Sequence, residues 1–377
     1  MDFDYVVIPA LILLVGALLV WLSLRRILLL SAKNCPTWRK VTERIVLSLA
    51  ALACAAVAAS ASFNAVSLLY FRAHNPPPGD TYLVAGHRMH MICTGSGSPT
   101  LVLDAGLGND ALVWGGVQPW LSRTTRVCAY DRAGFGWSVA LPPPRDADHI
   151  TSELHQLLLQ ANISGPIVLI GHSIAGIYIR DYAARFPTDV AGLVFVDSST
   201  PLQNQNPAFR AFIAKLPSPL LTRLESIAGV PRLRGECSQT FPDFDAHAGK
   251  MLAEENCHEQ FGAEAGELDS FTRSGEETVH TGPYGALPIL IFSQDPLKTL
   301  SQSNPPKYLV DLANVWNQMQ GDLLKLSTHS RRIIAKGSTH YVQLDRADLI
   351  KKEIPLFIEQ IRSTAPQPTT FGSTVNE

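Results

Sequence analysis

Two long runs without a charged residue occupy most of the first 72 positions, and they constrain the fold more than any other feature. The runs cover residues 5–24 and 45–71, and mostly apolar side chains fill both. A helix of about 20 residues crosses a bilayer core of about 30 Å. Asp2 and Asp4 do not fit the basic start of a cleaved signal peptide. Two charge-free runs of this length also disfavour a soluble helical hairpin, so we predict a transmembrane hairpin within residues 1–72.

The segment between the two runs is strongly basic. Against the single acid Glu43 it holds Arg25, Arg26, Lys33, Arg39, Lys40 and Arg44. The positive-inside rule therefore places this loop in the cytoplasm. Both ends of the hairpin and the rest of the chain are then expected on the other side, in the periplasm or outside the cell if the source is bacterial.

Charge also limits the partners. The formal net charge is -2, and it combines a basic segment 1–72 with an acidic remainder. A chain this close to neutral is not a bulk electrostatic binder of nucleic acid. We expect a membrane partner through the N-terminal helices and no nucleic acid.

After a Pro-rich linker at 73–80, short apolar runs alternate with helical patterns. Strands are predicted at 81–85, 88–93, 101–104, 126–130, 167–170, 190–196, 288–292 and 331–335, and helices at 149–161, 174–186 and 349–361. This alternation predicts an α/β fold with a mostly parallel sheet covered by helices on both faces. The core would comprise 81–199 and 286–365. Residues 200–285 lack a convincing strand and are predicted to form a helical cap, and 366–377 to form a flexible tail.

A serine stands where a strand pattern passes into a helix pattern. Its surroundings form a turn of mainly small residues: Gly171, His172, Ser173, Ile174, Ala175 and Gly176. Small neighbours permit the tight turn that raises a serine hydroxyl at the sheet edge, above the free N–H groups of a helix N-terminus. The pattern departs from G-x-S-x-G at Ala175. A serine that only caps a helix would look similar, so the role of Ser173 as nucleophile depends on its partners.

The general base that we predict is His340. It follows the last predicted strand in a loop, from which it can reach over the sheet edge. A serine hydroxyl needs such a base to remove its proton. His172 adjoins the serine and is expected to shape the turn, and His329 precedes the strand at its other end.

Two aspartates compete as the acid that orients this base. Asp295 follows the strand at 288–292, and Asp197 follows the strand at 190–196. Both are expected at the carboxyl edge of the sheet, where open α/β sheets bind their ligands. We predict Asp295 from the chain order serine, acid, histidine, and keep Asp197 as the alternative.

An oxyanion formed during attack needs backbone donors. The N–H of Ile174, one residue past the serine, is one candidate. The turn at 104–109, which follows the third predicted strand, can supply a second, for which we predict Leu107.

These residues together resemble the α/β-hydrolase superfamily over about residues 81–362. The segments Tyr-Asp-Arg-Ala-Gly-Phe-Gly-Trp-Ser at 130–138 and Gly-Leu-Val-Phe-Val-Asp-Ser at 192–198 look like the turn after its fourth strand and its sixth strand. Trp316, Gln320, Leu324 and the segment 337–343 are similar to a membrane-anchored, bacterial-type branch. The resemblance implies a Ser-Asp-His site under a helical cap. Many members carry His-Gly at the oxyanion turn, where this chain has Ala105-Gly106.

Cysteines and cofactor motifs carry weaker signals. Cys237 and Cys257 lie in the predicted cap, where an oxidising compartment could join them, and reduced thiols are the alternative. Cys93 and Cys128 fall on predicted strands, where strand geometry disfavours a bridge. No zinc-type spacing, phosphate-binding loop or dinucleotide glycine pattern occurs, so no metal and no cofactor are predicted.

The function predicted from these residues is a membrane-anchored serine hydrolase acting on an ester, thioester or amide. Its substrate would be a small or lipid-like acyl compound. A serine nucleophile argues against the epoxide hydrolases and haloalkane dehalogenases that the family also contains. Three alternatives remain: an acyltransferase on the same triad, a non-catalytic binding protein on a hydrolase scaffold, and a structural membrane protein.

Overall fold

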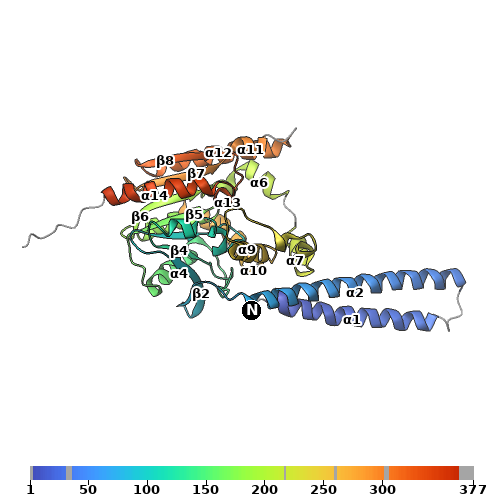
Figure 1. Ribbon diagram of the computed structural model, residues 1–377. Helices are drawn as coiled ribbons and strands as arrows, with labels where there is room; N and C mark the ends of the chain where they lie inside the picture. The colour runs from blue at the N-terminus through green and yellow to red at the C-terminus, as the bar shows by residue number, and fades with distance from the viewer. Residues whose placement is uncertain (1–2, 31–35, 216–217, 259–260, 301–304, 365–377) are drawn as a thin grey trace, which may run out of the picture. The chain divides into compact units, whose positions relative to one another are not determined.

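A computed structural model describes residues 3–30, 36–215, 218–258, 261–300 and 305–364 (Figure 1). The predicted tail at 366–377 and Lys33 of the basic loop lie outside the described residues. Contacts divide the chain into two compact units. The hairpin unit comprises Met1–Pro78 and Leu216–Phe261, and the sheet unit comprises Gly79–Lys215 and Gly262–Glu377. The segment 200–285, predicted as one cap, is therefore divided between the two units.

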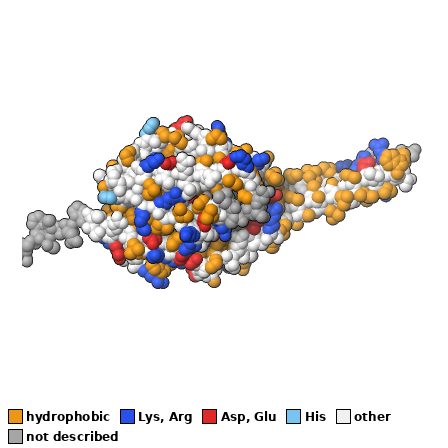
Figure 2. All heavy atoms as spheres, turned by 90° about the horizontal axis from the view of Figure 1, so that it is seen from above, with side chains coloured by type: hydrophobic (Ala, Val, Ile, Leu, Met, Phe, Trp, Pro, Cys, Tyr) orange, Lys and Arg blue, Asp and Glu red, His pale blue; other side chains and the backbone are white. Residues whose placement is uncertain are grey.

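The hairpin unit begins with two long helices, α1 (Phe3–Leu30) and α2 (Thr37–His74). Both extend beyond the uncharged runs, and both are long and apolar enough to cross a membrane, with mean hydropathies of 2.7 and 2.2 in their most apolar windows. Most of their apolar side chains are exposed, and hydrophobic side chains dominate the visible surface of the hairpin (Figure 2). Exposure of so much apolar surface over two helices is typical of segments that contact lipid.

Small residues bring the two helices together. Ala51 and Ala58, seven residues apart on α2, are buried. A side chain at Gly16 of α1 would come within 3.1 Å of the methyl group of Ala58. Glycine and alanine at such a crossing allow close backbone approach, which favours helix pairing in lipid.

Short helices of the cap segment complete the hairpin unit. They are α7 (Pro219–Ile227), α8 (Val230–Leu233), η3 (Glu236–Ser238) and α9 (Ala246–Asn256). A disulfide joins Cys237 to Cys257 across this segment, with their Cα atoms 5.2 Å apart. Polar contacts tie the segment to α2, including an ion pair between Arg72 and Glu255 at 3.1 Å.

The sheet unit is built on eight strands in the order β1-β2-β4-β3-β5-β6-β7-β8. Their bounds are Asp80–Val84, His87–Thr94, Thr100–Asp104, Val127–Tyr130, Ile167–His172, Val190–Val196, Ile289–Gln294 and Ser330–Ala335, numbered β1 to β8 along the chain. The β1–β2 and β2–β4 pairs are antiparallel, and every pair from β4 to β8 is parallel. The predicted mostly parallel sheet is confirmed.

Helices cover both faces of this sheet. Side chains of a strand alternate between faces. On β6 the residues Leu193 and Phe195 join a buried cluster with Leu154 of α4 (Ala147–Gln160) and Ile179 of α5 (Ala175–Arg185). On the opposite face, Gly192 of β6 lies against Phe357 of α14 (Ala347–Thr364). Burial on both faces explains why the central strands read as continuous apolar runs.

The remaining elements of the sheet unit connect the strands or extend beyond their ends. They are η1 (Ala111–Trp114), α3 (Gln118–Leu121), α4 (Ala147–Gln160), α5 (Ala175–Arg185), η2 (Gln203–Gln205), α6 (Pro207–Ile213), α10 (Phe261–Thr278), α11 (Pro296–Leu300), α12 (Lys307–Asp322), η4 (Leu323–Leu326), α13 (Val342–Asp345) and α14 (Ala347–Thr364). As predicted, the insertion between β6 and β7 has no strand among its described residues.

A second disulfide corrects the expectation for Cys93 and Cys128, which strand geometry was expected to keep apart. The two residues face each other directly in the antiparallel β2–β4 pair. Their Cα atoms are 4.1 Å apart, as in the narrow, non-hydrogen-bonded pairs of an antiparallel ladder. The side chains of such a pair leave the sheet on the same side and meet, which allows the bond.

We expect this bridge to stabilise the sheet unit. It closes a loop with a sequence separation of 35 residues, and a loop of that size is worth about 3–4 kcal/mol in the chain-entropy account. The double substitution Cys93→Ser with Cys128→Ser should lower the free energy of unfolding of the detergent-solubilised protein by that order, measured by denaturant titration. Cys54→Ser, at a free cysteine, is the control. Equal unfolding midpoints for both variants would contradict the expectation.

Candidate active site

The carboxyl ends of the parallel strands meet at one edge of the sheet. In the register of the sheet, Asp104 at the end of β3 faces Gly171 of β5, and His172 of β5 faces Val196 of β6. Ser173, Asp197, Asp295 and His340 follow β5, β6, β7 and β8, respectively. The sheet therefore collects every predicted side-chain candidate at the edge where open α/β sheets bind ligands.

Ser173 occupies a strained turn. Its φ is +54°, a left-handed conformation that residues other than glycine seldom adopt. A Cβ on Gly171 would lie 2.8 Å from the carbonyl oxygen of Ala175, and one on Gly176 would lie 2.4 Å from Cβ of Ser198. The turn therefore requires glycine at both positions, whereas at position 175 the fold buries an alanine side chain fully. This explains how the motif accommodates Ala175.

His340 pairs with Asp197. Its Nδ1 lies 2.6 Å from Oδ2 of Asp197, whose side chain is fully buried, while the imidazole is about one-third exposed. A carboxylate only accepts hydrogen bonds, so Nδ1 is the donor, and in the neutral imidazole the lone pair is then on Nε2. The ring of Trp316 meets the imidazole edge-on, with centroids 5.6 Å apart. The pair is thus held in one tautomer and one orientation.

The preference for Asp295 over Asp197 does not agree with this geometry. Oδ2 of Asp295 accepts the backbone N–H of Gly337 at 2.8 Å, and Oδ1 accepts the N–H of Leu297 at 2.9 Å. Asp295 therefore caps α11 and holds the loop after β8, and its oxygens serve backbone donors rather than His340.

Two hydrogen-bond donors bind Oδ1 of Asp197, the carboxylate oxygen that is not paired with His340. Oδ1 accepts the indole N–H of Trp316 and the backbone N–H of Gln294, each at 2.9 Å. These bonds leave Oδ2 directed at His340. Chain order could not separate the two aspartates, since both lie between Ser173 and His340. Trp316 is the residue in the sequence that could have pointed to Asp197, because a buried indole N–H needs a hydrogen-bond acceptor.

His172 supports the loop that carries His340, the predicted base. Its Nε2 donates to the carbonyl oxygen of His340 at 3.1 Å, and the two rings lie 4.7 Å apart. Burial, and then the neighbouring His340, lower the pKa of His172 well below its usual value. His172 is therefore a neutral donor, and its role in shaping the turn stays a prediction.

The turn after β3 is held by a buried guanidinium. Nη1 of Arg132 donates to Oδ1 of Asp104 at 2.7 Å and to the carbonyl oxygen of Ala105 at 2.5 Å, and Nη2 donates to the carbonyl oxygen of Gly106 at 2.9 Å. Glu267 of α10 completes the set with bonds to Nε and Nη2 at 2.7 and 3.0 Å. Burial acts to lower the pKa of Arg132, but Glu267 and Asp104 outweigh it and raise the pKa well above its usual value.

This arrangement orients the predicted oxyanion donor. In a trans peptide the C=O and N–H point in opposite directions, so the bond from Arg132 to the carbonyl of Gly106 turns the N–H of Leu107 away from Arg132. Gly106 itself adjoins the serine, because a Cβ built on it would lie 3.2 Å from Cβ of Ser173. Among the described residues, neither the N–H of Leu107 nor that of Ile174 donates a backbone hydrogen bond.

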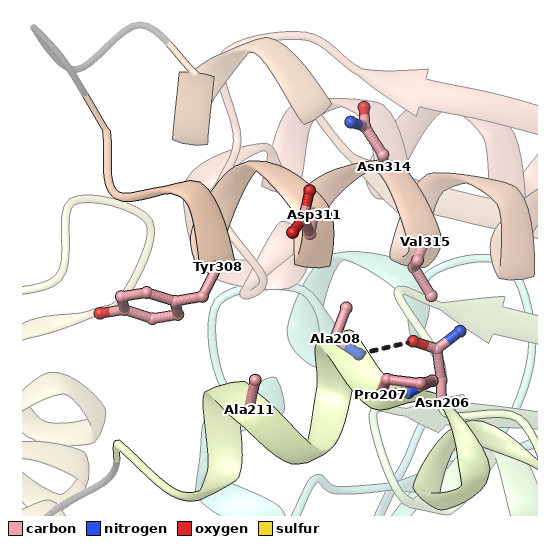
Figure 3. A pocket seen from close by; sticks show the side chains of 8 residues that line it. All are labelled: Asn206, Pro207, Ala208, Ala211, Tyr308, Asp311, Asn314 and Val315. Carbon is pink, nitrogen blue, oxygen red and sulfur yellow. Dashed lines mark hydrogen bonds between the residues drawn. The ribbon is translucent and has the colours of Figure 1, made fainter.

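A pocket of about 460 Å³ lies between α6 and α12 (Figure 3). Its lining comprises Asn206, Pro207, Ala208, Ala211, Tyr308, Asp311, Asn314 and Val315. Phe209 of α6 and Trp316 of α12 also pack in one buried cluster with Ile174 and Tyr178 of the serine turn and its helix. The pocket is therefore built on the two helices that support the site, although Ser173, Asp197 and His340 do not line it.

One group of side chains has the composition of a metal site but does not fit one. Cys237, Glu254 and Cys257 approach each other within 4.8 Å in the cap segment. The disulfide consumes both thiolates, which are the form of cysteine that binds metal. Glu254 is paired with Arg232.

Comparison with known proteins agrees with this architecture. Residues 101–352 match the Alpha/beta hydrolase family. An AB hydrolase superfamily protein of Gibberella zeae is 26% identical over 290 residues, which cover 70% of this chain and 87% of the relative. An uncharacterized protein of Schizosaccharomyces pombe is 44% identical over 84 residues, 22% of this chain and 16% of the relative. The chain spans 16% and 44% of the lengths of the first two curated relatives that it matches.

Solved structures share the fold. The crystal structure of a membrane phospholipase A, described as a bacterial virulence factor, superposes with a TM-score of 0.56 at 19% identity, covering 86% of this chain and 99% of that one. The fold and the superfamily predicted from the sequence are confirmed.

The neutral state of buried His172 predicts a pH dependence of stability. Unfolding exposes this imidazole, so below about pH 6.5 the unfolded chain binds a proton that the folded chain excludes, and stability falls as the pH is lowered. Between pH 7.5 and 5.5, His172→Gln should lose about 1 kcal/mol less unfolding free energy than the unsubstituted protein. Denaturant titrations at the two pH values measure this, with His280→Gln at an exposed position as control. The same loss in all three proteins would rule out a neutral His172.

Proposed function

This chain belongs to the α/β-hydrolase family, and on that premise we propose that it is a membrane-anchored serine hydrolase, which cleaves an ester, thioester or amide through an acyl-enzyme on Ser173. One observation carries the proposal. Ser173 stands in a strained left-handed turn, at the same sheet edge as a histidine whose Nδ1 is 2.6 Å from a buried aspartate. A hydroxyl nucleophile, a base and an acid that orients the base are the parts that acyl transfer requires.

In the proposed first step, Oγ of Ser173 attacks the acyl carbon of the substrate. Nε2 of His340 takes the hydroxyl proton, and Asp197 stabilises the imidazolium that forms. The C–O, C–S or C–N bond to the leaving group then breaks, and the leaving group receives the proton from His340. Asp197 replaces Asp295 in this role because its oxygen reaches Nδ1 of His340.

Water completes the cycle. His340 removes a proton from a water molecule, the resulting hydroxide attacks the acyl carbon, and Ser173 leaves with its proton restored. The acid product is released. An acyltransferase would differ only in the acceptor that replaces water.

We assign the oxyanion donors to the backbone N–H groups of Leu107 and Ile174. The bonds of Arg132 to the carbonyls of Ala105 and Gly106 support this assignment, because they fix the turn before a substrate arrives. Donors that need no rearrangement during the reaction stabilise developing charge best.

Anchoring by α1 and α2 would place the sheet unit on the non-cytoplasmic side. The basic residues between the two helices support this topology. The four disulfide-bonded cysteines all follow α2 in the chain, which agrees with an oxidising compartment. A lipid-like acyl ester is the substrate class that this location favours, and one protein with the same fold is described as a membrane phospholipase A.

The nucleophile can be tested by covalent labelling. A fluorophosphonate probe should label the purified full-length protein, and Ser173→Ala should abolish the labelling, because the probe reports an activated serine hydroxyl. Ser363→Ala, at an exposed position on α14, is the control and should label normally. Equal labelling of the unsubstituted protein and Ser173→Ala would refute the proposal and favour a non-catalytic scaffold.

The two aspartates can be separated by parallel substitutions. Asp197→Asn should lower kcat on a short p-nitrophenyl ester by roughly 10³–10⁴-fold, because the amide no longer holds the correct tautomer of His340. Asp295→Asn removes an acceptor for backbone N–H groups and should change kcat by no more than about tenfold. Circular dichroism of both variants checks that the fold is intact. A larger loss in Asp295→Asn would return the role to Asp295.

A further inference from the structure

The cap segment of the hairpin unit exposes a group of leucines. Leu220, Leu221 and Leu224 on α7 are 64%, 54% and 52% exposed, and Leu233 on α8 is 70% exposed. At 3.6 residues per turn, the three leucines of α7 fall within an arc of about 100°. Ser226 lies outside this arc and is buried. The leucines of α7 therefore face outward, while Ile227 at its C-terminal end is buried.

Hydrogen bonds fix this segment at one level of α2. Oγ of Ser60 donates to the carbonyl oxygen of Ala228 at 2.6 Å, and Nδ2 of Asn64 donates to the carbonyl oxygen of Ser226 at 3.0 Å. Both acceptors belong to the C-terminal end of α7. These two hydrogen bonds join the C-terminal end of α7 to one turn of α2.

That level coincides with the far boundary of the proposed membrane span. The uncharged part of α2 starts at Ile45, after Arg44, and about 20 helical residues cross the hydrocarbon core. The core would then end near Asn64. The rest of α2, up to His74, would extend beyond it, so α7 sits where hydrocarbon gives way to headgroups.

A buried polar cluster makes the attachment firm. Asn64 is 2% exposed, and its Oδ1 also accepts from Nε of Arg232 at 3.0 Å and lies 3.1 Å from Nε2 of His258. Arg232 is in turn paired with Glu254. An asparagine in an apolar helix is costly in lipid unless its amide is satisfied, and here the cap segment satisfies it.

The charge of the segment is slightly basic. Residues 218–234 contain Arg223, Arg232 and Arg234 against the single acid Glu225, and the pairing of Arg232 with Glu254 and of Arg234 with Glu225 leaves one positive charge in excess. Lys250 of α9 lies with its Nζ 5.6 Å from the ring of Phe71 on α2. Leucines on one side of a helix with basic residues nearby are typical of elements that lie in the interface and attract anionic lipid.

We propose that α7 and α8 form a lipid-docking surface, with Leu220, Leu221, Leu224 and Leu233 inserted at the boundary between headgroups and acyl chains of the non-cytoplasmic leaflet. The proposal rests on the membrane span of the proposed function. α7 contacts both α1 and α2, so its leucines belong to the same unit as the exposed apolar side chains of the hairpin. The cap segment is thereby held against the leaflet by its own side chains as well as by α2.

Quenching of a fluorescent probe tests the depth of the surface. The full chain, with Cys35 and Cys54 replaced by serine, receives one new cysteine labelled with NBD and is reconstituted in vesicles of phosphatidylcholine and phosphatidylglycerol. Leu224→Cys is the test position. Leu159→Cys, 56% exposed on α4 of the sheet unit, is the matched control, and Leu49→Cys, 62% exposed within the uncharged part of α2, marks the hydrocarbon core. Quenchers are a nitroxide on the lipid acyl chain and aqueous iodide.

The proposal predicts that the lipid nitroxide quenches the probe at Leu224→Cys less than at Leu49→Cys but far more than at Leu159→Cys, with less quenching by iodide than at Leu159→Cys. The probe at Leu159→Cys should be quenched mainly by iodide. Iodide quenching at Leu224→Cys as strong as at Leu159→Cys would place α7 in water, and quenching by neither agent would mean that protein covers it. Either result overturns the docking surface while lipid quenching at Leu49→Cys upholds the anchor. Loss of lipid quenching at Leu49→Cys would overturn both.

Discussion

The buried guanidinium of Arg132 is the interaction on which the candidate site depends. It binds Asp104 at the end of β3, two carbonyls of the following turn and Glu267 of α10. Burial raises the pKa of Asp104 even though Arg132 and Tyr130 act to lower it. Removing one member of a buried, hydrogen-bonded ion network costs about 3–5 kcal/mol. The turn beside Ser173 is therefore held by electrostatics that no single strand or helix supplies.

Much of the sheet unit could be predicted from the sequence because strands buried on both faces leave an apolar signature. The predicted strand at 190–196 coincides with β6, and the others differ from the observed strands by a residue or two at their ends. The turn around Ser173 could also be predicted from the sequence, because Gly171 and Gly176 stand at positions that have no room for a side chain. Features that depend on residues close together in the chain could therefore be predicted from the sequence.

Features that depend on contacts across the fold were not accessible in this way. The choice between Asp197 and Asp295 is made by the indole of Trp316, which lies 119 positions from Asp197 in the chain. The bridge between Cys93 and Cys128 depends on the register of β2 against β4. The attachment of α7 to α2 involves Asn64, which stands in the sequence among the serines of an apolar run and in the structure donates to the carbonyl oxygen of Ser226.

The length of α2 gives the molecule a mechanical property. Its 38 residues span about 57 Å, nearly twice the thickness of a bilayer core, and the cap segment is bonded to the part near the far end. A helix whose apolar length does not match the local bilayer responds by tilting. With α2 spanning the membrane as proposed, a change of bilayer thickness would change the tilt of this helix, and α7, α8 and α9 would move with it. Lipid composition would then set the orientation of these helices in addition to solvating the anchor.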